Sequence, residues 1–100
     1  MSYGRRRTAN LTDSGQISTA GIAAELLELV FTGVTAGDTI TLTNGSGGST
    51  ITGPLTVPAN GNVKLGPYDE GKGIVFNADI YASVAKTGNA CVFVVYRELE

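Results

Sequence analysis

Short runs in which apolar and polar residues alternate, separated by glycine- and asparagine-rich turns, constrain the fold of this chain most. Residues 38–43 place Ile40 and Leu42 on one face and three threonines on the other, which is typical of a half-buried strand. The next residues, 44–48, read Asn-Gly-Ser-Gly-Gly and indicate a turn, because several of them tolerate a positive φ. This alternation recurs along the chain and predicts a protein made of strands.

The same pattern predicts several more strands. Pro54 lies between two of them and indicates an edge strand or a bulge, since proline has no N–H to donate. Residues 58–62 and 86–89 carry the signals of hairpin turns. Both faces of 90–97 are apolar, so we expect this strand to be central or covered on both sides. The further predicted strands are 49–52, 55–57, 62–66, 74–76, 80–84 and 90–97.

Residues 19–31 fit two structures. The run at 23–29 has high helix propensity and is long enough for two helical turns. Leu27, Leu29 and Phe31 also alternate with Glu28 and Val30, and on this ground we favour a strand over 25–32. The sum is seven or eight short strands, which predicts an all-β fold, either an antiparallel β-sandwich or a jelly-roll-like barrel.

The charges divide the chain into two parts. Arg5, Arg6 and Arg7 are three of its seven basic residues, whereas residues 8–100 hold four basic and nine acidic side chains, a net charge of −5. We therefore expect residues 1–15 to be a flexible basic arm and 16–100 to be a single β-sandwich domain. The arginines are candidates for binding an acidic partner, because a guanidinium pairs with carboxylates in a bidentate manner. The alternative is a solvated tail.

Composition argues against most enzymatic chemistry. The chain has no histidine and one cysteine, so it has no imidazole for acid–base work or metal binding, and it cannot form an internal disulfide. Cys91 lies in the most apolar predicted strand and is expected to act as a small hydrophobic residue. No nucleophile, base and orienting group can be assembled, and we expect neither an enzyme nor a cofactor or metal site.

The remaining candidate residues lie in loops and on strand faces. The carboxylates of Asp69 and Glu70 are predicted to lie in a solvated turn, in preference to a calcium or acid–base site. Tyr68 and Tyr81 are candidate surface contacts, and with Tyr96 they offer the alternative of a sugar-binding platform. We favour Tyr81 and Tyr96 as cross-strand partners. No apolar run is long enough for a membrane helix, so we expect no membrane contact.

Three segments resemble a known group of proteins: 29–42, 55–59 and the closing 90–97, which reads Ala-Cys-Val-Phe-Val-Val-Tyr-Arg. They are similar to short β proteins encoded among the virion genes of tailed bacteriophages. The likeness extends over 25–97, about three-quarters of the chain, and consists of strand and turn residues. It implies a small virion accessory protein, made in the host cytoplasm, of the capsid decoration or cement type, which is often trimeric. It supplies no ligand or catalytic residue.

We therefore expect a homo-oligomer, with a trimer favoured, that binds the major capsid protein or another virion protein. Only 16% of the residues are charged, which also suggests that other subunits cover part of the surface. The alternatives are a head–tail connector, tail or fibre component, and a carbohydrate- or receptor-binding β module. The acidic body argues against nucleic acid as a partner, since it would repel the phosphates. Three arginines would also neutralise few of them.

Overall fold

The structure, a computed structural model, describes residues 5–33, 36–58, 62–87 and 90–99. These residues form nine strands and no helix, so no helix among them is long and apolar enough to cross a membrane. The predicted all-β class is confirmed, with nine strands where seven or eight were expected. The strands are β1 (Arg7–Leu11), β2 (Gly15–Gln16), β3 (Ala24–Gly33), β4 (Thr39–Asn44), β5 (Thr50–Thr56), β6 (Asn62–Leu65), β7 (Ile74–Phe76), β8 (Ile80–Ala85) and β9 (Ala90–Glu98).

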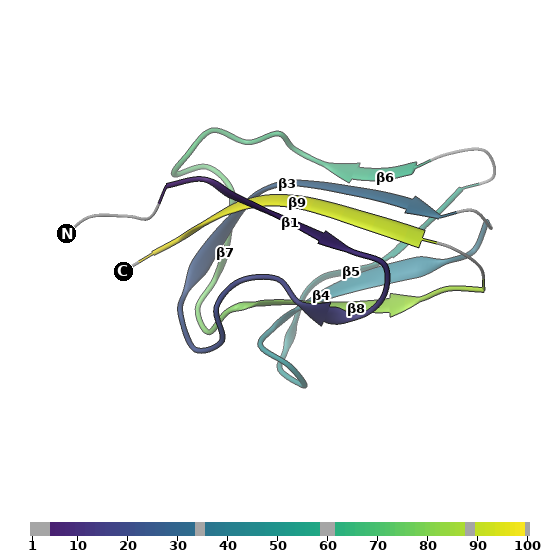
Figure 1. Cartoon of the computed structure of the whole chain (residues 1–100), viewed down its shortest axis with the longest axis horizontal. Helices are drawn as coiled ribbons and strands as arrows, with labels where there is room; N and C mark the ends of the chain where they lie inside the picture. Colours follow the sequence, from purple (N-terminus) through teal and green to yellow (C-terminus); the bar gives the residue numbers. More distant parts are fainter. Residues whose placement is uncertain (1–4, 34–35, 59–61, 88–89, 100) are drawn as a thin grey trace.

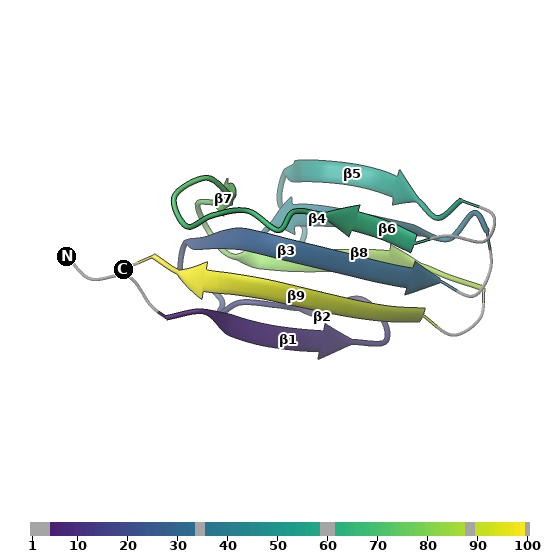
Figure 2. The ribbon, with the colours of Figure 1, turned by 90° about the horizontal axis from the view of Figure 1, so that it is seen from above.

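The strands form two antiparallel sheets that pack face to face (Figures 1 and 2). The five-stranded sheet has the order β1-β9-β3-β6, with β7 also paired to β3, and the four-stranded sheet has the order β2-β8-β4-β5. The predicted β-sandwich is therefore confirmed. β1 pairs with β9, β2 with β8, β3 with both β6 and β7, and β4 with β5 in a hairpin. A long hairpin rolled up in this way gives the strand order of a jelly roll.

The ambiguous segment 19–31 contains a strand, as favoured from its alternation. β3 lies in the interior of its sheet, with β9 on one side and β6 and β7 on the other. Leu29 and Phe31 are fully buried, while Glu28 and Val30 point to the opposite face and are only partly buried. Pairing along both edges outweighs the helix propensity of the sequence, which is a weak preference by comparison.

The core lies between the sheets and is built from the inward side of each alternation. Ile40 and Leu42 of β4 have no exposed surface, and neither have Val92 and Val94 of β9. Close packing of such side chains is the main source of stability in a domain of this size. The buried cluster comprises Ile17, Ala24, Leu26, Leu29, Phe31, Ile40, Leu42, Val57, Phe76, Ile80, Ala82, Ala90, Val92, Val94 and Tyr96.

Two predicted hairpins are wrong. The turn signals at 58–62 and 86–89 do mark the ends of strands, but β5 and β6 belong to different sheets, and so do β8 and β9. Residues 59–61 and 88–89 lie outside the described residues. A turn residue shows where a chain reverses, but not whether the next strand pairs with the previous one or crosses to the other sheet. The turn at 44–48 does join a hairpin, β4–β5.

Part of the expected arm belongs to the sandwich. β1 pairs along its whole length with β9, from Arg7 opposite Tyr96 to Leu11 opposite Val92. Ala9 and Leu11 pack against the core from this edge. This pairing satisfies one edge of β9 and makes that strand central, as expected from its two apolar faces. Residues 1–4 lie outside the described residues.

Two phenylalanine truncations distinguish the inner from the outer face. Phe31→Ala should lower the free energy of unfolding by about 3–5 kcal/mol, because it leaves a cavity between the sheets. Phe93→Ala, on the partly exposed outer side of β9, should lower it by only about 1 kcal/mol. Urea unfolding monitored by circular dichroism measures both. Equal losses would contradict this assignment of faces.

Candidate functional site

Three apolar side chains on the outer face of the five-stranded sheet form the candidate site. Val30 of β3 lies directly opposite Phe93 of β9, and Val95 follows on the same side of β9. All three are partly buried, in contrast to their fully buried neighbours Val92 and Val94 on the inner side. We call Val30, Phe93 and Val95 the apolar patch. It occupies the middle of the sheet, where β3 and β9 pair.

One end of this outer face is covered by residues 66–73, which we call the strap. The strap joins β6 to β7, and it is fixed to β3 by backbone hydrogen bonding: the Tyr68 N–H donates to the Leu27 carbonyl at 2.8 Å. The register between β3 and β9 shifts between Leu26 and Glu28, so Leu27 is an extra residue in a bulge. Leu27 is fully buried although it is outside the core cluster between the sheets.

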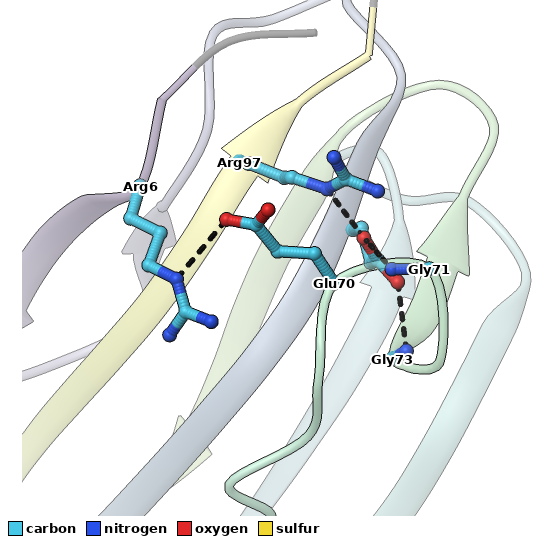
Figure 3. Close-up of polar contacts among 6 residues, drawn as sticks. Arg6, Glu70, Gly71, Gly73 and Arg97 are labelled. Atoms are coloured by element: carbon cyan, nitrogen blue, oxygen red, sulfur yellow. Dashed lines mark hydrogen bonds and ion pairs between the residues drawn. The ribbon is translucent and has the colours of Figure 1, made fainter.

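A buried carboxylate fastens the other half of the strap. Glu25 of β3 is 1% exposed, and its oxygens accept hydrogen bonds from the N–H groups of Gly71 at 3.1 Å and Gly73 at 2.7 Å. Arg97, its cross-strand neighbour on β9, donates from Nε at 2.6 Å (Figure 3). Three donors from two elements therefore converge on one carboxylate, and they hold the strap, β3 and β9 together.

The strap approaches β3 so closely that glycine is required. A Cβ on Gly73 would overlap the Leu26 carbonyl oxygen, and one on Gly66 would lie 2.5 Å from the Leu27 carbonyl oxygen. Gly66 also has a φ of +81°, which side-chain-bearing residues rarely adopt. These glycines let both ends of the strap lie directly on the bulged part of β3.

The environment of Glu25 sets its protonation. Burial disfavours its charged form, but the hydrogen bonds from Arg97, Gly73 and Gly71, together with the positive charge of Arg97, outweigh burial and lower the pKa of Glu25. Hydrogen bonding from Thr19 lowers the pKa of Glu98, with burial opposing it and the charge of Arg7 adding to it. Both carboxylates are therefore ionised at neutral pH and stabilise the fold in that form.

The structure pairs two of the predicted arm arginines with carboxylates of the same chain. Arg6 Nε lies 3.1 Å from Oε2 of Glu70 on the strap, with about half of each side chain exposed (Figure 3). Arg7 Nη1 lies 3.7 Å from Oε1 of Glu98. Arg5 is exposed and forms no ion pair among the described residues. Arg6 thus lies beside the strap, toward the same outer face as the apolar patch.

The tyrosines are separated. Tyr68 belongs to the strap and Tyr81 to β8 of the other sheet, where it lies opposite Gln16 and Thr43. Tyr96 points into the core and lies opposite Leu26. The predicted cross-strand pair of Tyr81 and Tyr96 is therefore wrong, because β8 and β9 are in different sheets. For the same reason the three rings do not form one platform.

Cys91 also differs from its prediction. It is exposed on the outer side of β9, opposite Thr32, and is not buried as a small hydrophobic residue. The alternation along β9 explains this position, since Val92 and Val94 take the inward side. Asp69 and Glu70 are exposed in a turn closed by the Lys72 N–H and the Asp69 carbonyl at 2.9 Å, as expected.

Two further acidic side chains are buried away from the apolar patch. Asp79 accepts from Gln16 Nε2 and from the Gly21 N–H, each at 2.8 Å, and so fixes the connection between β2 and β3. Asp38 accepts from the N–H and the hydroxyl of Thr87 through Oδ1, while its buried Oδ2 has no hydrogen-bond partner among the described residues. The described residues hold no pocket and no cluster of three metal-ligating side chains.

Comparison with known proteins leaves the family open. No family model matches the chain, and neither the curated proteins nor the solved structures yield a significant match. The site therefore has to be interpreted from its own geometry.

The sequence did not predict the roles of Glu25, Arg97 and the strap, because a glutamate among alternating leucines is typical of a solvent-facing residue. The signal available was Gly71 and Gly73 two residues apart in a polar loop, which indicates a tight backbone approach.

Stability should fall in acid because of Glu25 and Glu98. Their pKa values are lower in the folded than in the unfolded chain, so their contribution is complete above the unfolded value, near pH 4.5, and is lost as the pH falls through the lower folded values. We expect Glu25→Gln to lower the free energy of unfolding at pH 7 by about 3–5 kcal/mol, since it leaves Arg97 buried beside a neutral partner. The decline between pH 5 and 3 should also become shallower. Urea titrations at each pH measure both effects.

Glu28→Gln is the matched control. Glu28 is on the same strand, but it is partly exposed and lies 3.9 Å from Lys64, so its loss should change stability by less than about 1 kcal/mol. An unchanged acid slope in Glu25→Gln would contradict the role given to this carboxylate.

Proposed function

We propose that this chain is a structural virion protein, a decoration subunit that binds the surface of a phage head and stabilises the shell. Residues 25–97 resemble small virion proteins of tailed bacteriophages in their strand and turn sequences. The strand order is that of a jelly roll, an architecture that viral capsid domains share with lectins and cupins. Fold alone does not specify function, so the proposal depends on the surface.

The observation that carries the proposal is the apolar patch. Val30, Phe93 and Val95 lie together on the two strands at the middle of the sheet, and the strap covers only the end of that face. An apolar area surrounded by polar groups marks a protein-binding surface on a soluble protein. A ring such as Phe93 at the centre of a face is suited to anchor a partner, because binding hot spots are few, central and often aromatic.

The arginines add a polar contact at the edge of this face. The pair between Arg6 and Glu70 is half exposed, and such pairs contribute only about 0–1 kcal/mol. Arg6 can therefore exchange Glu70 for a carboxylate of a capsid protein with little loss, and exposed Arg5 needs no exchange. Contacts of this strength add little by themselves, so the apolar patch has to supply most of the affinity.

A binding assay with phage heads tests the proposal. We expect the purified chain to co-sediment with heads of the phage that encodes it, and Phe93→Ala to weaken this binding by about 30-fold, the effect of a hot spot worth about 2 kcal/mol. Ile51→Ala is the control. Ile51 is an exposed apolar residue of β5 on the other sheet, so this variant should bind heads as the wild type does. Point variants are preferable to deletion of the arm, residues 1–15, which would remove all of β1.

The outcomes separate the alternatives. Binding to tails and not to heads would move the protein to the tail. Equal losses in Phe93→Ala and Ile51→Ala would show that the apolar patch is not the contact. Absence of binding to every part of the virion would overturn the proposed function.

A further inference from the structure

The charged residues are distributed unequally between the two sheets. The strands of the four-stranded sheet, β2, β4, β5 and β8, contain no charged residue, although the chain has seven basic and nine acidic side chains. Residues 39–63 form a continuous run without a charge. The strands of the other sheet carry six charged residues: Arg7, Glu25, Glu28, Lys64, Arg97 and Glu98.

The outer side of the four-stranded sheet is instead rich in hydroxyl groups. Ile40 and Leu42 of β4 point inward and are fully buried, so the threonines between and beside them point outward. Thr41 lies opposite Ser83 of β8, and both are at the middle of the sheet. We call this surface the hydroxyl face; it comprises Thr39, Thr41, Thr43, Thr50, Thr56 and Ser83, with the Tyr81 ring beside Thr43.

We propose that the hydroxyl face is a self-association surface that binds the same face of a second copy of this chain. In a two-fold contact a residue near the axis meets its own equivalent, so a charge at the centre of the contacting face repels its copy. The chain carries a net charge of −2, and a face without charges is where two copies approach with least repulsion. This inference does not depend on the proposed function, which uses the opposite face.

Hydrogen bonding favours the same occupant. A hydroxyl both donates and accepts, whereas a carboxylate only accepts and an ammonium group only donates. A face of threonine and serine is therefore complementary to a copy of itself. Loss of charge is also what distinguishes the centre of a protein interface from the rest of a surface.

The contact should be face to face and not edge to edge. β5 is one edge of this sheet, but Pro54 has no N–H to offer a neighbouring strand, and the other edge, β2, has only two residues. The β4–β5 register also shifts twice, between Ile40 and Leu42 and between Leu42 and Thr43, which bends the edge. These features impede the addition of a strand.

The size of the face predicts a weak dimer. Six residues of strand span about 20 Å and the three strands β4, β5 and β8 about 14 Å, so the face measures about 300 Å² per copy. A stable dimer needs about 800 Å² from each partner. We therefore expect association that becomes visible only at high protein concentration.

Sedimentation velocity from about 10 μM to about 1 mM tests the proposal. The wild-type chain should show a concentration-dependent shift toward dimer, and Thr41→Lys should weaken this association at least about tenfold, because two like charges would meet. An equimolar mixture of Thr41→Lys and Thr41→Glu should recover it, since opposite charges then meet. Thr32→Lys, an outward residue of β3 on the other sheet, is the control and should associate as the wild type does.

Two results of this experiment would overturn the proposal. A wild-type chain that stays monomeric up to about 1 mM overturns the proposal. Loss of association in Thr32→Lys but not in Thr41→Lys would place the contact on the apolar patch and also overturn it. Circular dichroism verifies the fold of each variant, and Ser83→Lys replaces Thr41→Lys if the latter unfolds. Failure of head binding in the previous assay leaves these results unaffected, so the two proposals fail separately.

Discussion

The five-stranded sheet, much of the core and the strap all depend on the pairing of β3 with β9. These two strands form the longest ladder in the structure, and each has a further strand on its other edge, β1 beside β9 and β6 and β7 beside β3. Their inward side chains form much of the core. Their outward side chains include both the apolar patch and the buried pair of Glu25 and Arg97, to which the strap is bound. A change in this register would turn core residues to the surface and surface residues to the core.

The two outer faces of the sandwich differ in chemistry. One presents apolar side chains beside ionic groups and the strap, and the other presents hydroxyl groups without a charge. On the first face the buried ion pair is retained although a buried charge is expensive, because its carboxylate satisfies two strap N–H groups in addition to Arg97. The second face has no such ion pair, and apart from the Tyr81 ring it presents the short side chains of threonine and serine. The sandwich therefore presents two outer faces of different chemistry.

Much of the fold was predictable because strands with one buried face have a strict period of two. The alternation at 38–43 predicted the all-β class, and the two apolar faces of 90–97 predicted a central or doubly covered strand, which β9 is. The sheet to which each strand belongs was not predictable, because the turns at 58–62 and 86–89 have the same residues whether the chain returns to its neighbour or crosses over. The Glu25 site was missed for a related reason: its partners are 46 to 72 residues away in the sequence. Only the folded chain brings them together.

The position of β9 has a consequence for synthesis on the ribosome. β9 is the last of the nine strands in sequence order, yet it lies between β1 and β3. Until residues 90–98 have emerged from the exit tunnel, β1 has no partner and one edge of β3 stays open, so the five-stranded sheet cannot close before β9 has been made. Contacts of such long sequence separation also form slowly. During this interval the apolar strand β3 has one edge unshielded, and chaperones would have most to protect.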